Sequence, residues 1–218
     1  MAEIETQVVI AFCALLVVWY IVGRQVNRGR GGRLLAWILQ GLRPLGDQIT
    51  VSRLGTSGFQ VNVGKAQAPF KRIETAILLE PREILLLWIL NRLRGRTDHL
   101  VLKGTLRASP RGEVEVVKKR GRLAGRGLEE LDQIAWTRLE TIGDDLVIAC
   151  RGEKGQRQAE AISHLVEGLS PRLLRLSLSK KAPHLLLNLS LAGLDERSAL
   201  LLLSSLQDLA QIVARGGH

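Results

Sequence analysis

The chain has 218 residues, 46 % of them hydrophobic, and 31 Lys and Arg against 21 Asp and Glu, which leaves a net charge of +10. This charge favours negatively charged partners such as nucleic acid or lipid head groups, and the few aromatic residues argue against stacking on single-stranded bases as the main binding mode. Two cysteines and four scattered histidines argue against a disulfide framework or a metal site, so we expect no cofactor and no metal.

Residues 6–23 form a stretch without any charged side chain, TQVVIAFCALLVVWYIVG. A helix of this length rises about 27 Å, close to the thickness of a bilayer core, so we expect a transmembrane helix after a short external tail, residues 1–5. Glu3 and Glu5 precede it and arginines follow it, which places the N-terminus outside and the rest in the cytoplasm. The expected location is the plasma membrane.

Two alternatives compete with this anchor. A cleaved signal peptide needs a basic start and a small-residue cleavage site, whereas this chain begins with acidic residues and carries Trp19 and Tyr20 late in the apolar run. A buried helix of a soluble protein rarely lacks a polar face altogether. We therefore favour an uncleaved anchor.

Residues 24–46 are predicted to be a basic linker with one short amphipathic helix. Gly29–Gly32 reads as a flexible link, and Leu34, Trp37 and Leu42 have the spacing of a helix near the bilayer or against the domain. Pro44 and Gly46 end it. The residues expected at the membrane interface are Trp19, Tyr20, Arg24, Arg28, Arg30, Arg33 and Trp37.

The cytoplasmic domain is expected to span residues 47–215, with a possible subdivision near 140–145. Residues 49–52 and 59–63 alternate with period two around the turn Gly55–Gly58, which predicts a hairpin, and a third strand is expected over 71–79. Residues 81–94 predict a helix that begins at Pro81. Its apolar run, 84–90, favours a buried core helix, with a helix on the membrane surface as the alternative.

Residues 98–107 and 113–118 are predicted to pair as a second hairpin across Ser109–Gly112. A basic glycine-rich loop, 118–126, and a helix over 128–139 follow.

The last third predicts a strand at 146–150, a helix at 156–167 stopped by Gly168, and two strands with alternating leucines. A final helix carries a stripe from Ala199 to Val213, with Asp195 as its N-cap and Gly216 as its C-cap. The expected fold is α+β, a single N-terminal transmembrane helix followed by antiparallel hairpins with packed helices.

A search for catalytic chemistry finds no nucleophile with a base and no phosphate-binding loop, because the glycines after Lys118 lack a following Lys-Ser/Thr. His99, His164 and His184 lack ligand spacing and are expected on the surface. We therefore predict a non-enzymatic protein.

The remaining signal is electrostatic. Basic residues dominate between positions 92 and 126, and they are suited to neutralise phosphates without reading a sequence. Structured RNA, lipid head groups and a merely solvated surface all remain possible, and the two clusters are free to lie at shared or at opposite ends of the sheet. The candidate phosphate-binding residues are Arg92, Arg94, Arg96, Lys118, Lys119, Arg120, Arg122 and Arg126.

The order of these elements resembles the calumin family, coiled-coil-domain-containing membrane proteins of the endoplasmic reticulum that belong to an intramembrane chaperone complex. The stretch RLLAW, 33–37, is similar to the family's short helix. The stretch ILLEPREILL, 77–86, followed by LRGRTDHLVL, 93–102, is similar to its centre. The family's long acidic external region and its C-terminal coiled coil have no counterpart here, so the chain looks like a short archaeal-type relative.

The resemblance implies a factor for biogenesis of multipass membrane proteins, which would dock on the ribosome, through its RNA, and on a Sec-type translocon. Small membrane-protein partners and nascent multipass proteins would be its other partners, and anionic lipid head groups are a further possibility. The alternative function is a membrane-anchored lipid-binding or signalling module without ribosome contact.

Overall fold

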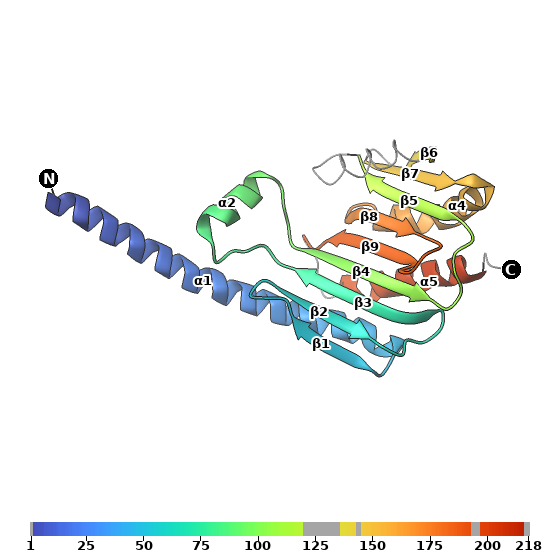
Figure 1. The fold of residues 1–218 in the computed structure, drawn as a ribbon, viewed down its shortest axis with the longest axis horizontal. Helices are drawn as coiled ribbons and strands as arrows, with labels where there is room; N and C mark the ends of the chain where they lie inside the picture. The colour runs from blue at the N-terminus through green and yellow to red at the C-terminus, as the bar shows by residue number, and fades with distance from the viewer. Residues whose placement is uncertain (1, 120–135, 143–144, 193–196, 216–218) are drawn as a thin grey trace.

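The computed structural model describes residues 2–119, 136–142, 145–192 and 197–215. It has an α+β fold in which the described strands form one antiparallel sheet in the order β1-β2-β3-β4-β9-β8-β5-β7-β6. Helices α4 and α5 and the C-terminal half of α1 lie on one face of this sheet, while the N-terminal half of α1 projects away from it (Figure 1). The expected fold class is thereby confirmed at the level of an α+β domain behind a long apolar helix.

Helix α1 runs without a break from Ala2 to Leu42, so it contains both the predicted span and the predicted linker. The prediction of a flexible link at Gly29–Gly32 is wrong, because these residues are helical. Packing against the sheet explains the difference: a side chain at Gly31 would meet Leu79 and Phe59. Glycine weakens a helix by only about 1 kcal/mol, which tertiary contacts outweigh. A short 3₁₀ turn, Arg43–Leu45, ends the element at Pro44.

The first three strands follow the sequence prediction. Strands β1 (Ile49–Arg53) and β2 (Gly58–Val63) form the expected hairpin, and β3 (Phe70–Leu78) adds the third antiparallel strand. Helix α2 (Leu85–Leu93) comes next, but it stands apart from the sheet (Figure 1). The prediction that it is a buried core helix is wrong, since most of its leucines and isoleucines are exposed.

Strands β4 (His99–Leu106) and β5 (Glu113–Lys118) do not form the predicted hairpin. Two strands from the end of the chain, β8 (Leu173–Leu178) and β9 (Leu185–Ser190), lie between them, so β4 pairs with β9 and β5 pairs with β8. The β8–β9 hairpin itself was predicted. Inserting its leucines between β4 and β5 buries apolar surface that a direct β4–β5 pairing would leave without neighbours.

Strand β6 (Thr137–Ile142) pairs with β7 (Leu146–Arg151). The predicted helix over 128–139 is therefore wrong for residues 137–139, which belong to β6. The β-branched Thr137, Thr141 and Ile142 of that strand favour an extended backbone. Residues 128–135 lie outside the described part of the chain. The strand predicted at 146–150 is confirmed.

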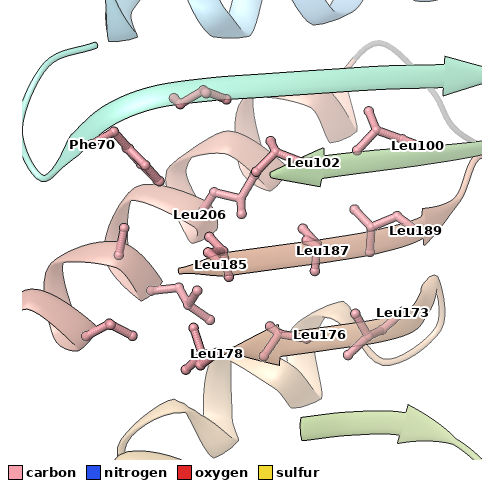
Figure 2. Packing of buried hydrophobic residues seen from close by; sticks show 14 of the residues in the cluster. Phe70, Leu100, Leu102, Leu173, Leu176, Leu178, Leu185, Leu187, Leu189 and Leu206 are labelled. Carbon is pink, nitrogen blue, oxygen red and sulfur yellow. The ribbon is translucent and has the colours of Figure 1, made fainter. Parts of the chain in front are cut away.

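Helices α4 (Gly152–Leu169) and α5 (Arg197–Arg215) complete the fold, and Gly168 lies within α4 rather than ending it. The main core forms where their inward side chains meet alternating leucines of β4, β8 and β9, as Figure 2 shows for Leu206 of α5 beside Leu102 of β4 and Leu185 of β9. The predicted caps Asp195 and Gly216 lie outside the described residues.

Candidate functional site

The most concentrated set of polar contacts joins α1 to the segment between β3 and β4. We call it the junction, and it consists of Asn27, Arg30, Glu80, Arg82, Glu83 and Asp98. Asn27 is only 2 % exposed and anchors the α1 side. Its Nδ2 donates to the Glu80 carbonyl oxygen at 2.9 Å and to Glu83 Oε2 at 2.7 Å. A buried asparagine with satisfied partners holds a helix in one register.

Asp98 is the centre of the charged contacts. Both of its carboxylate oxygens accept hydrogen bonds from Arg82, at 3.0 and 3.1 Å, and the Glu80 amide donates to it at 2.8 Å. Arg30 of α1 also forms an ion pair with it. The two-pronged contact between Arg82 and Asp98 fixes a planar guanidinium in one orientation. Asp98 thus ties α1, the β3–α2 connection and the start of β4 together.

Glu83 links the junction to the β1–β2 turn. Thr56 and Ser57 each donate a hydroxyl hydrogen bond of 2.7 Å to its Oε1. Burial by itself raises the pKa of Glu83, but the bonds from Ser57, Thr56, its own backbone and Asn27 outweigh burial and hold the pKa below the ordinary value. Protein hydrogen-bond donors thus take the place of water around the buried Glu83 carboxylate and favour its charged form.

Close backbone contact continues the junction toward the N-terminus of α1. A Cβ on Gly23 would lie 2.3 Å from the Arg82 carbonyl oxygen, so only glycine permits this approach. Four residues earlier, Trp19 Nε1 donates to the same carbonyl at 2.9 Å. The Trp19 ring also packs against Trp88 of α2, with 5.3 Å between centroids. These contacts bring α2 alongside the last turn of the predicted span.

The chemistry of the junction is that of a fixed joint. Each of its carboxylates accepts hydrogen bonds from, or pairs with, a side chain of the same cluster. Within the described ranges, no group of three His, Cys, Asp or Glu side chains is arranged to hold a metal ion. The junction instead fixes α1 in one position relative to the sheet.

The sheet places the two predicted basic clusters at the same end. Val117, Arg175, Asn188 and Val101 are register partners across β5, β8, β9 and β4. The end of β5, with Lys118 and Lys119, therefore lies level with the start of β4, which follows Arg92, Arg94 and Arg96. Three strand spacings, about 14 Å, separate β4 from β5. Arg120, Arg122 and Arg126 lie outside the described residues.

This shared end is also the end at which α1 meets the sheet, because Gly58, Leu78 and His99 are register partners beside the junction. Arg92, Arg94, Arg96 and Lys119 are exposed there, and Lys118 is half-buried. We call these five residues the basic rim. Their common position was not predictable from the sequence, because it depends on β8 and β9 lying between β4 and β5.

The residues predicted at a membrane interface have different environments. Arg24 and Arg28 are exposed, Tyr20 is 44 % exposed, and Arg30 pairs with Asp98. Trp37 does not belong to this set: it is 6 % exposed and packs in the main core. It lies some 27 Å along the helix from Trp19, so the two tryptophans cannot serve one interface.

A groove of about 330 Å³ lies between α1 and the β1–β2 turn. Arg24, Arg28 and Arg53 line it together with apolar residues such as Leu35 and Phe59. Among the described residues these three arginines have no ion-pair partner. A groove with several guanidinium groups and an apolar floor suits an anion with a hydrophobic part.

The prediction that His184 lies on the surface is wrong, because its side chain is buried and only 8 % exposed. Its Nδ1 accepts the Leu106 amide hydrogen at 3.0 Å, and its Nε2 lies 3.2 Å from Ser109 Oγ. Because Nδ1 accepts, the ring hydrogen is on Nε2 and points to Ser109, so His184 is no base for that hydroxyl. The pair fastens the loop after β4.

Sequence reasoning missed the junction. The one signal in the sequence was a solitary acid, Asp98, shortly after Arg92, Arg94 and Arg96. Both Arg82 and Asp98 fall in the stretch on which the family resemblance rests. No protein-family model matches the chain, and a comparison with curated proteins found no significant match.

Proposed function

We propose that this protein is a membrane-anchored, non-enzymatic factor in the biogenesis of multipass membrane proteins. It would dock on the ribosome and a Sec-type translocon as part of an intramembrane chaperone complex with small membrane-protein partners. The observation that carries the proposal is the continuity of α1. One helix is apolar and exposed over the first half, long enough to cross a membrane, and enters the domain core at Trp37 and Ile38.

The position of the basic rim relative to α1 supports this proposal. With residues 6–23 in the plasma membrane and the N-terminus outside, the junction holds the basic rim toward the cytoplasmic surface of the bilayer. Ribosomal RNA approaches a membrane at that place when a ribosome is bound to a translocon. Arg and Lys side chains there neutralise phosphates without sequence readout.

The test is co-sedimentation of the full chain, in neutral nanodiscs, with ribosomes over a range of salt concentrations. Lys118→Ser/Lys119→Ser should weaken binding and flatten the log–log salt slope by about 0.7–0.9 for each phosphate that is no longer neutralised. Lys180→Ser/Lys181→Ser is the matched control, because it removes the same charge from the β8–β9 turn at the opposite end of the sheet. Equal effects of the two pairs would contradict the proposal.

A lipid-binding module is the second candidate, and the groove beside α1 favours it. Arg24 and Arg28 follow the predicted span directly, where the head groups of a surrounding bilayer would lie. Adding anionic phospholipid should then raise the Tm of the detergent-solubilised chain, and Arg24→Gln/Arg28→Gln should remove that rise. Phosphatidylcholine, which is neutral overall, should leave the Tm unchanged.

A further inference from the structure

The surface of α2 is the least expected feature of the domain. Leu86, Ile89, Leu90 and Leu93 have the spacing i, i+3, i+4, i+7, so they form a single stripe along the helix. In other α-helices of this fold such a stripe faces the sheet, but here Leu86 is 69 % and Leu93 is 80 % exposed. Among the described residues outside α1 and the α2 segment, the only exposed large hydrophobic side chains are Val51 and Leu54, at 43 % and 41 %.

The opposite side of α2 is held by specific contacts, so the outward direction of the stripe is built into the fold. Asn91 is buried and accepts a hydrogen bond from Arg96 at 3.2 Å. Trp88 packs against Trp19, and the chain immediately before the helix is fixed at the junction through Arg82 and Glu83. Turning the stripe inward would break these contacts.

The position of α2 along α1 indicates what covers the stripe. The predicted span ends at Gly23, and Trp19 lies four residues before it. At 1.5 Å per residue, Trp19 is therefore about 6 Å inside that end of the span. Amphipathic helices that lie in a membrane surface bury their apolar face about 5–10 Å deep. A bilayer around residues 6–23 would therefore reach the stripe of α2 at the depth at which such helices bind.

The charged residues next to the stripe are also suited to contact with a lipid bilayer. Arg92 and Arg94 are exposed and form no ion pair with any described residue, and Arg96 is exposed at the end of the helix. Arginine keeps its guanidinium at the level of lipid phosphates while its methylene groups lie along apolar surface. Apolar residues on one side and arginines at one end are the composition of a membrane-surface helix.

We propose that α2 is a membrane-surface helix that inserts Leu86, Ile89, Leu90 and Leu93 into the cytoplasmic leaflet, with Arg92, Arg94 and Arg96 on the phosphates. This inference rests on the membrane anchoring in the proposed function but not on ribosome binding. It gives the domain a second attachment beside α1, so the sheet is held at a fixed tilt rather than free to rotate about a single helix.

The experiment places an environment-sensitive fluorophore on single cysteines of the full chain, in a Cys13→Ala/Cys150→Ala background. The chain is reconstituted as one copy per nanodisc, so a second copy cannot cover the stripe, and no other protein is present. The label positions are Leu86→Cys and Leu93→Cys on α2, Val17→Cys in the predicted span, and Ala161→Cys on the exposed side of α4. Quenching by lipids with a nitroxide on the acyl chain reports contact with the bilayer.

The expected result is strong quenching at Val17 and, with a shallow nitroxide, at Leu86 and Leu93, at least several-fold above Ala161. Quenching at both α2 positions no greater than at Ala161, with Val17 quenched, would overturn the inference and leave the anchoring intact. Absence of quenching at Val17 would overturn the anchoring and this inference with it. Neither result depends on ribosome binding, which the lysine variants test separately.

Discussion

Helices α2 and α5 are both leucine-rich and amphipathic, and they have opposite relations to the sheet. Leu206, Leu209 and Val213 of α5 are buried in the main core, whereas Leu86 and Leu93 of α2 are the most exposed large hydrophobic side chains among the described residues. Polar contacts at Asn91 and in the junction fix α2 outside the sheet, while the buried residues of α5, such as Leu206 and Leu209, are apolar. An apolar stripe therefore shows that one face of a helix packs against something apolar, but it does not show whether the partner is the sheet of the same chain or another surface.

The largest effect is expected from a charge on the covered stripe. Leu206 is 2 % exposed, and Leu206→Asp would place a carboxylate among core leucines without a partner. We expect the free energy of unfolding to fall by about 4 kcal/mol, measured by urea titration of the chain in a non-ionic detergent. A loss below about 1 kcal/mol would mean that α5 does not pack on the sheet as described.

The next largest effect is expected at the contacts that keep α2 in place. Asp98→Ala would remove the shared partner of Arg82 and Arg30 and leave the Glu80 amide unpaired. Breaking such a partly buried pair costs about 3 kcal/mol. The same urea titration measures it, and trypsin cleavage after Arg82 should become faster. Arg72→Ala is the control, because its ion pair with Glu74 lies on an exposed part of β3.

A smaller and pH-dependent effect is expected at Glu83. Its pKa in the folded chain is lower than the ordinary value of 4.5, so its stabilising effect is complete above pH 4.5 and disappears as pH falls through the lower folded pKa. Glu83→Gln should remove that part of the acid dependence, measured as the free energy of unfolding between pH 3 and 6.

The hydrogen bonds to Glu83 provide the control. Thr56→Ala/Ser57→Ala removes two of the groups that lower its pKa, so the free energy of unfolding of this variant should change less between pH 3 and 6 than that of the wild-type chain, as in Glu83→Gln. If the pH dependence is the same in all three proteins, the junction does not depend on the charge of Glu83.

The smallest effect on folding is expected on the uncovered stripe. Leu93 is 80 % exposed, so Leu93→Asp should change the free energy of unfolding in detergent by no more than about 0.5 kcal/mol. The contrast with Leu206→Asp, the same substitution on the other leucine-rich helix, is the sharpest form of the comparison. A large loss of stability for Leu93→Asp would mean that part of the chain covers α2.

The amino-acid sequence by itself determined the elements whose signal is local. The uncharged run at 6–23, the β1–β2 hairpin with its Gly55–Gly58 turn, the alternating leucines of β8 and β9 and the stripe of α5 all follow from residue spacing. Spacing reports which side chains share a face, and that is a property of a few consecutive residues.

Only the tertiary structure decided which faces are covered and which strands pair. The helical state of Gly29–Gly32 depends on contacts with the sheet, the separation of β4 from β5 depends on a hairpin from the end of the chain, and the exposure of α2 depends on the junction. Arg82 and Asn27, which are 55 residues apart, meet there. Such contacts gain their energy from burial and from partners distant in the chain, so no local pattern contains them.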